Sequence, residues 1–362
     1  MKSPLTILNV AYPFAEVGDC AVGGAEQIVA ALDRALVAAG HHSLVAACEG
    51  SQVAGTLLAT PKVRGDLTEN LRAMVQRSHR RTIESALKRW PIDLVHFHGV
   101  DFHTYYPASK PPALVTLHLP IAWYPEQIFA PAFGRLFLQC VSDSQQTDLR
   151  ARYLSLPVIE NGVPIHALGA KHARRRFVLC LGRICPEKGF HLAFEAARLA
   201  GAPLLLAGEL FRYPSHQKYF QKEILPRLDR QRRWIGPVGF VRKRRLLSAA
   251  RCLLVPSLVK ETSSLVAMEA LACGTPVIAS PQGALPEIIA QGVTGFLVRN
   301  IDEMAEAICN VGKLNPETCR ATACQRFSME RMISSYFDLY QKLAAATSMG
   351  DDDFLSDPAW SN

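Results

Sequence analysis

Short apolar runs alternate with segments of helical periodicity along nearly the whole chain, and this alternation constrains the fold more than any other feature. An apolar run at 5–10 is followed by a helical pattern over 25–39 and by a second apolar run at 43–47. This strand–helix–strand order is typical of parallel sheets whose strands are joined by helices. At 362 residues the chain exceeds the usual size of one domain, so the pattern predicts an α/β fold with two domains.

The pattern divides into two sets of strands and helices. A basic segment at 161–176, which contains Asn-Gly-Val-Pro, is interpreted as the linker between them. We expect a first domain at 1–165, a second at 166–328 and an acidic tail at 347–362. The first set adds a helix at 67–89 and strands at 93–98, 113–118 and 137–142. The second comprises strands at 177–182, 203–208, 252–256, 276–280 and 295–298, and helices at 190–200, 216–228, 242–250 and 329–346.

The chain shows no signal for export or membrane insertion. Its N-terminal apolar run is too short for a signal peptide, and no segment reaches about 18 consecutive apolar residues. The ten cysteines include no CxxC pair, and the spacings Cys180/Cys185 and Cys319/Cys324 do not match a zinc site. We therefore expect free, buried thiols in a reducing cytoplasm and no bound metal.

The net charge of +8 has local sources. Basic residues gather at 72–89, 171–176, 227–233 and 242–245. They are interpreted either as solvated helix faces or as surfaces that attract anionic substrates or the inner face of an anionic membrane. The helix at 67–89 has an apolar side and a basic side, so it either covers a sheet or lies on anionic lipid. No nucleic-acid recognition motif accompanies the charge, so nucleic acid is not an expected partner.

A glycine pair, Gly23 and Gly24, precedes the first predicted helix. The turn does not match GxGxxG, so the dinucleotide fingerprint is absent. Two adjacent glycines nevertheless allow the backbone to approach a ligand closely, beside a helix N-terminus that favours negative charge. The alternative is a flexible loop before a helix.

Several histidines lie near the carboxyl ends of predicted strands, where open parallel sheets bind their ligands. His118 ends the strand at 113–118 and is a candidate functional residue; the alternative is a loop histidine bonded to backbone. His96 and His98 share one strand face, and His103 follows. A metal site there has weak support, because Asp101 is the sole nearby carboxylate and no cysteine lies at ligand spacing.

Arg183 and Lys188 follow the strand at 177–182, in a loop with a proline and a glycine. Arginine offers a planar fork of donors and lysine a compact charge, a combination suited to a diphosphate. The alternative is a pair of surface cations bonded to Glu187 or Glu209.

The segment from Glu261 to Glu269 combines two carboxylates, three hydroxyl side chains and the start of a helix. Thr262 or Ser263 is expected to cap that helix. The amides of Ser264, Leu265 and Val266 would then point at an anion. Glu269, about one turn further along, would reach a ribose diol, and Glu261 would reach the other way to a sugar. The helix is expected to end at Cys273 and Gly274, before Pro276.

The GGAE turn, the TLH strand end, the LGRICPEKG loop and the run ETSSLVAMEALACGTPVIASPQGALPEII together resemble the family 4 retaining glycosyltransferases of the GT-B fold. The resemblance extends from residue 5 to about residue 345, and the last motif is long and specific. It implies two Rossmann-like domains facing a central cleft, with the acceptor in the N-terminal domain and the nucleotide sugar in the C-terminal domain. It also implies that the helix at 329–346 packs back on the first domain.

The resemblance implies a role for each matching residue. Arg183 and Lys188 would clamp the diphosphate, Glu269 would contact the ribose, and Glu261 would hold the hydroxyls of the donor sugar. His118 would lie near that sugar, and the Gly23–Gly24 loop would close on the donor. His118, Arg183, Lys188 and Glu261 form the implied catalytic set, and Thr262 to Val266 complete the donor site. The sequence departs from the family where Thr262-Ser263-Ser264 replaces x-Phe-Gly, which is expected to alter the choice of donor sugar.

The implied reaction transfers a sugar, most simply from a UDP-sugar, to a glycan, glycolipid or small-molecule hydroxyl with retention of configuration. It uses neither a metal ion nor a cofactor, because fixed positive groups stabilise the leaving diphosphate. The departing phosphate would accept the proton of the acceptor, so Glu261 would orient the sugar rather than attack it. Two alternatives remain: a nucleotide-sugar epimerase or hydrolase of the same fold, and a non-catalytic sugar-nucleotide-binding protein.

Overall fold

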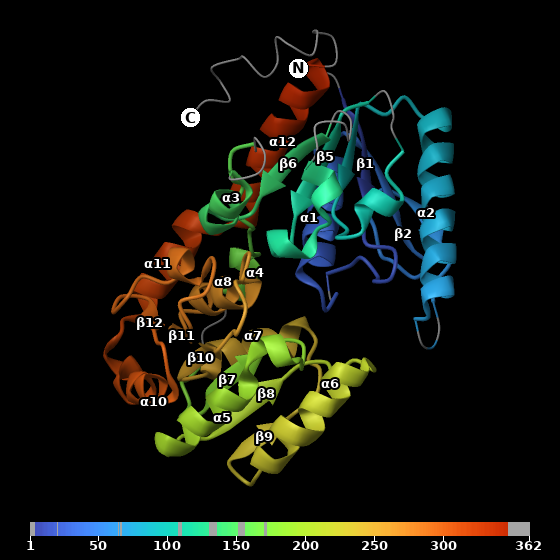
Figure 1. The fold of residues 1–362 in the computed structure, drawn as a ribbon. Helices are drawn as coiled ribbons and strands as arrows, with labels where there is room; N and C mark the ends of the chain where they lie inside the picture. The colour runs from blue at the N-terminus through green and yellow to red at the C-terminus, as the bar shows by residue number, and fades with distance from the viewer. Residues whose placement is uncertain are drawn as a thin grey trace. The chain divides into compact units, whose positions relative to one another are not determined.

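The computed structural model describes residues 4–19, 21–63, 65, 67–107, 111–129, 136–150, 156–169 and 172–346 (Figure 1). The chain forms two compact units of similar size. Unit 1 contains the residues up to Glu160 together with those from Met332 onward, and unit 2 contains Asn161–Arg331. The acidic tail predicted at 347–362 lies outside the described residues.

Unit 1 is built on a six-stranded sheet in the order β3-β2-β1-β4-β5-β6, and all its strand pairs are parallel. All five residues of β1 (Thr6–Val10) are buried, as expected for a strand covered on both faces. The strand β3 (Thr56–Thr60) is absent from the predicted set, because this edge strand is half exposed and lacks a long apolar run. The other elements are α1 (Gly24–Ala38), β2 (His42–Cys48), α2 (Glu69–Arg89), β4 (Leu94–Phe97), β5 (Ala113–Leu117), β6 (Leu136–Cys140), α3 (Asp143–Arg150) and α12 (Met329–Ala346).

Unit 2 repeats this plan with the sheet order β12-β11-β10-β7-β8-β9, again all parallel. Its two core clusters draw on alternate residues of the same strands, so helices cover both faces of the sheet. The strands are β7 (Val178–Leu181), β8 (Leu204–Ala207), β9 (Arg232–Trp234), β10 (Cys252–Val255), β11 (Val277–Ala279) and β12 (Gly295–Leu297). The helices are α4 (Ile165–Leu168), α5 (Phe190–Leu199), α6 (Pro214–Tyr219), α7 (Phe240–Ala249), α8 (Leu265–Ala272), α9 (Leu285–Ile288), α10 (Ile301–Asn310) and α11 (Pro316–Arg326).

Both sheets have the Rossmann order 3-2-1-4-5-6 when the strands of each unit are numbered from its own start. The order reverses between β1 and β4 in unit 1 and between β7 and β10 in unit 2. Ligands of such sheets bind outside the carboxyl ends of the strands at this reversal. In unit 2 the segments leaving it are the Arg183–Gly189 loop after β7 and the Glu261–Ser264 segment after β10.

The boundary between the two units lies at Glu160/Asn161, where the linker was predicted to begin. The segment at 161–176 is itself part of unit 2: Leu168 of α4 is fully buried there, and Val163 pairs with Ser328. The helix predicted at 216–228 is α helical only to Tyr219, and it continues as a π turn to Ile224 and a 3₁₀ turn that contains Pro226. Proline has no backbone N–H, so it cannot extend the α ladder.

Candidate functional site

The loop after β7 is fixed against the loop after β10. Gly189 has φ +60°, and a Cβ at this position would collide with the carbonyl oxygen of Pro256. The amide of Leu258 donates to the carbonyl of Glu187 over 2.8 Å. Glycine is required here because it adopts a positive φ and leaves room for the close approach. The two segments in which sequence analysis placed the donor site therefore lie side by side.

Lys188 and Glu261 form an ion pair across these two loops. The Lys188 Nζ and Glu261 Oε1 atoms are 2.6 Å apart, and the two side chains are 27% and 10% exposed. The backbone of Glu261 is held in turn by Gly283 and Ala284: the Ala284 amide donates to the Glu261 carbonyl over 2.7 Å. A Cβ at Gly283, whose φ is +60°, would collide with that carbonyl. The partner of Lys188 is thus Glu261, not Glu187 or Glu209.

Arg183 is half-buried directly after β7. Among the described residues no carboxylate lies within ion-pair distance of its guanidinium. Burial acts to raise the pKa of Glu187, but hydrogen bonds with its own backbone amide and with Cys185, followed by the charges of His216 and Arg183, lower it. The alternative of an Arg183 bridge to Glu187 or Glu209 is therefore wrong. The guanidinium remains a positive group at the carboxyl end of the sheet.

The helix α8 begins at Leu265, one residue later than a cap at Ser263 would place it. Ser264 occupies the N-cap position without a side-chain hydrogen bond, so the predicted cap by Thr262 or Ser263 is wrong. The helical ladder starts with the amides of Ala267 and Met268, which donate to the Ser264 carbonyl over 3.0 and 3.1 Å.

The amides of Leu265 and Val266 precede this ladder, and the described residues offer them no acceptor. The Ser263 hydroxyl oxygen is buried and likewise has no partner in the described part of the chain. Free amides at a helix N-terminus attract anions, and a buried hydroxyl without a partner is costly. This helix end is therefore a place where an anionic or hydroxylated ligand would satisfy several groups at once.

Glu269 lies inside α8 and is 2% exposed. Its Oε1 atom is 2.5 Å from Nζ of Lys243 on α7, and the Lys243 side chain is 13% exposed. Burial raises the pKa of Glu269, while the Lys243 charge and hydrogen bond oppose that change. This role of Lys243 was not predicted, because the basic run at 242–245 was interpreted as surface charge.

The two predicted glycines of unit 1 stand at the start of α1. Gly23 is the N-cap residue in extended conformation, and Gly24 is the first helical residue. A Cβ at Gly23 would overlap the carboxylate of Glu26, whose side chain folds back over this helix end and is buried. Glu26 is the last residue of the GGAE turn, and no role was predicted for it.

His118 is half-buried in unit 1 and contacts a buried polar cluster. Its Nε2 atom is 3.0 Å from Nδ1 of His98, and the two rings stack with centroids 5.3 Å apart. Burial lowers the pKa of His118 to about 4, so the ring is neutral at pH 7. The partner of His118 in this contact is therefore a side chain and not backbone.

His96 does not serve the metal site considered for His96, His98 and His103. Its Nδ1 is 2.8 Å from the Tyr340 hydroxyl of α12, and its Nε2 is 2.8 Å from the Thr116 hydroxyl. Both ring nitrogens are therefore used. The tyrosines of α12 that enter this cluster, Tyr336 and Tyr340, had no signal in the sequence beyond the helical pattern itself.

Comparison with known proteins identifies the family. The profile described as "Glycosyltransferase Family 4" matches residues 22–166, and the one described as "Glycosyl transferases group 1" matches residues 175–313. The chain belongs to the family 4 glycosyltransferases. It is 30% identical to D-inositol 3-phosphate glycosyltransferase of Mycolicibacterium smegmatis over 285 residues, which cover 71% of this chain and 63% of the relative. The match thus spans less than two thirds of the length of that glycosyltransferase.

Solved structures confirm the GT-B fold. Sucrose-phosphate synthase of Thermosynechococcus elongatus matches with a TM-score of 0.79 at 19% identity, covering 94% of this chain and 100% of that one. HepE of Anabaena, solved in complex with UDP-glucose, matches with a TM-score of 0.74 at 19% identity, covering 92% and 99%. The predicted fold class and family are therefore both correct. No helix among the described residues is both long and apolar enough to cross a membrane.

Proposed function

We propose that this glycosyltransferase family member moves a sugar from a nucleotide-sugar donor to an acceptor hydroxyl, with retention of configuration and without a metal ion in the reaction. The observation that carries the proposal is the Lys188–Glu261 ion pair, which joins the two loops at the strand reversal of unit 2. A cation suited to a diphosphate and a carboxylate suited to sugar hydroxyls are thus in contact, which supports the proposal.

The donor diphosphate would be held by Arg183, Lys188 and the amides of Leu265 and Val266. Negative charge grows on the diphosphate as the glycosidic bond breaks, so fixed positive groups lower the barrier. Lys188 keeps its bond to Glu261 while binding phosphate, because an ammonium has three donors. Loss of one such group costs about 3 kcal/mol of transition-state stabilisation.

The carboxylates and hydroxyls position the donor. Glu261 accepts hydrogen bonds from the sugar hydroxyls, and Glu269 contacts the ribose. The Ser263 hydroxyl, buried without a partner in the described chain, gains one from the bound donor, and Thr262 and Ser264 shape the same wall.

The residues of unit 1 complete the proposed reaction. Neutral His118 offers hydrogen bonding beside the donor sugar rather than a charge. Gly23 and Gly24 form the loop that closes on the donor. The departing phosphate takes the proton of the acceptor hydroxyl, so no protein base is needed and no cofactor takes part.

A UDP-sugar is the donor favoured here, because HepE, which shares the fold, was solved with UDP-glucose. The acceptor is a glycan, a lipid-linked sugar or a small-molecule hydroxyl; the relative from Mycolicibacterium smegmatis is named for D-inositol 3-phosphate. We place the protein in the cytoplasm, with peripheral association at the inner face of an anionic membrane. The exposed arginines and lysine of α2 support that association: Arg77, Arg80, Arg81, Lys88 and Arg89.

The test is incubation with a panel of UDP-, GDP- and ADP-sugars, measuring nucleotide release with and without candidate acceptors and with a chelator. Acceptor-dependent release that survives the chelator, with an α-linked product from an α-linked donor by NMR, supports the proposal. Equal release without acceptor would instead indicate a hydrolase or epimerase. Tight nucleotide binding with no release from any donor would indicate a binding protein.

A further inference from the structure

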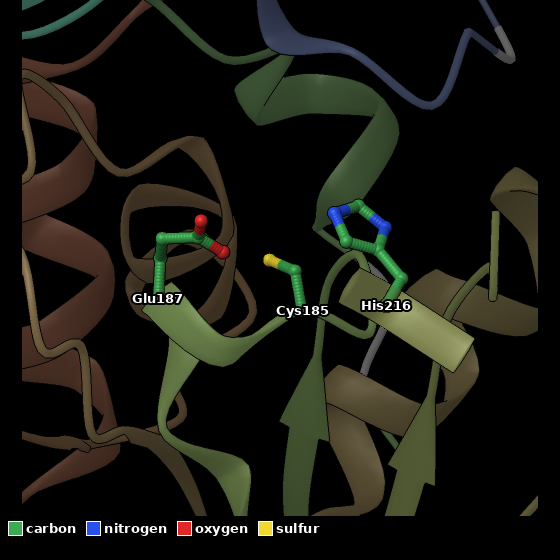
Figure 2. Close-up of side chains that lie close together, drawn as sticks. All are labelled: Cys185, Glu187 and His216. Carbon is green, nitrogen blue, oxygen red and sulfur yellow. The ribbon is translucent and has the colours of Figure 1, made fainter. Parts of the chain in front are cut away.

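Cys185, Glu187 and His216 come together in unit 2 (Figure 2). Cys185 and Glu187 belong to the loop after β7, and His216 belongs to α6, which follows β8. One ligand atom from each residue lies within 4.8 Å of the other two. In Figure 2 the Cys185 sulfur lies between the Glu187 carboxylate and the imidazole of His216.

The backbone fixes the two segments that carry this cluster. The amide of Ile184 donates to the carbonyl of Glu209 over 2.9 Å, which ties the loop after β7 to the segment leaving β8. The Glu187 carbonyl accepts from Leu258, which anchors the other end of the loop. Both segments that carry the three ligands are thus held in place by backbone hydrogen bonds.

The chemistry of the three groups suits a thiophilic divalent cation. A thiolate, a carboxylate and a neutral imidazole are the usual ligands of zinc, and two of them carry the negative charge that balances it. Burial and the nearby Arg183 charge lower the pKa of His216. The Nδ1 atom of His216 is buried and has no hydrogen-bond partner in the described chain.

We propose that Cys185, Glu187 and His216 bind one Zn²⁺ ion, with water in the fourth position. None of its ligands is assigned a contact with the donor or the acceptor in the proposed sugar transfer. Binding to the folded chain raises its melting temperature.

Cobalt titration of the full-length, reduced, metal-free protein tests the site. We expect one Co²⁺ per chain by native mass spectrometry and a thiolate-to-cobalt charge-transfer band that Zn²⁺ abolishes. Cys185→Ser should eliminate the band, and Glu187→Gln and His216→Ala should each weaken Co²⁺ binding by about tenfold or more. Cys324→Ser and His166→Ala are the matched controls, because both residues are exposed, and both variants should bind as the parent does.

Circular dichroism establishes that each variant is folded. A charge-transfer band that persists in folded Cys185→Ser would overturn the proposal, since another cysteine would then be the ligand. If Cys185→Ser does not fold, the other two variants decide: unchanged Co²⁺ affinity in both Glu187→Gln and His216→Ala would also overturn it. Absence of any stoichiometric Co²⁺ or Zn²⁺ binding by the parent protein has the same consequence.

Discussion

Replacing Lys243 by methionine tests whether the ion pair inside unit 2 is needed to keep Glu269 charged. The Glu269 side chain is 3% exposed and that of Lys243 is 13% exposed, with 2.5 Å between Oε1 and Nζ. Methionine keeps most of the apolar stem of lysine and removes the charge. A buried carboxylate without its partner is strongly unfavourable, by about 3–5 kcal/mol.

Glu269 can escape this penalty by taking up a proton, and that route limits the cost. The ordinary pKa of a glutamate is 4.5, and burial already raises the pKa of Glu269. Protonating it at pH 7 costs about 1.4 kcal/mol per pH unit above that value, or about 3 kcal/mol. The folded variant then holds a proton that the unfolded chain releases above about pH 4.5. Its stability relative to the parent therefore falls as the pH rises from about 4.5 to 7.

Urea unfolding of parent and Lys243→Met at a series of pH values measures the effect. We expect a destabilisation of about 3 kcal/mol at pH 7 that shrinks to about 1 kcal/mol near pH 5. The double variant Lys243→Met, Glu269→Gln is the control, because it has no group to titrate, so its difference from the parent should lack this pH dependence. A Lys243→Met destabilisation that is the same at both pH values, or as large in the double variant, would refute the reasoning.

Three further outcomes are expected. Arg183→Ala and Lys188→Ala should each reduce sugar transfer about a hundredfold or more while leaving the circular dichroism spectrum unchanged, and normal turnover in either would refute the diphosphate clamp. Burial of His79 lowers its pKa to about 4 in the folded protein. As the pH falls from 6.5 to about 4, this histidine is therefore protonated in the unfolded chain but not in the folded one. Stability should drop by up to about 3 kcal/mol over that window, measured by urea unfolding, and the drop should be smaller in His79→Gln; equal slopes in both proteins would contradict this. The protein should co-sediment with anionic vesicles at low salt and lose this binding in Arg77→Glu, Arg80→Glu, Arg81→Glu, whereas no binding at low salt would exclude membrane docking by α2.

The exposed basic face of α2 is also the reason to expect purely electrostatic docking. The apolar side of this helix already packs inside the fold, because Val75, His79, Ile83 and Ala86 are buried. Met74, an apolar residue of the same helix, is 50% exposed. Membrane binding by insertion of an apolar face would therefore require the helix to leave the fold, while binding by charge would not.

The sequence was sufficient to predict the helices and strands whose pattern of apolar residues is strongly periodic. The buried strands of both sheets and the helices α1, α2, α5 and α12 lie within a few residues of their predicted bounds. The helices α10 and α11 were missed although their starts carry a local signal. Asn300 caps α10 by accepting from the amide of Glu303, and Asn315 followed by Pro316 caps α11. These cues lie in the residue order and needed no tertiary information.

The two ion pairs of the site could not be predicted from the sequence. Its motifs indicated Lys188, Glu261 and Glu269 as site residues. The ion pairs Lys188–Glu261 and Lys243–Glu269, however, each join segments that only the strand order brings together. The predicted N-terminal cap of α8 was also wrong. A hydroxyl before a helix normally bonds an amide of the first turn, yet the Ser263 hydroxyl is buried and finds no partner among the residues that the structure describes. That departure from the local rule points to a ligand, because strained or unsatisfied groups gather at functional sites.

The two glutamates differ in how freely their lysine partners can respond to a ligand. Lys188 is 27% exposed and joins two loops, so water and phosphate can compete for its donors. Lys243 is 13% exposed and meets a carboxylate inside a helix, where no rearrangement avoids burying charge. Removal of Lys188 should therefore impair transfer with little loss of stability, whereas removal of Lys243 should destabilise the fold. A Lys188→Ala variant as unstable as Lys243→Met would mean that both pairs are structural and that the phosphate contact must come from Arg183 and the amides of α8.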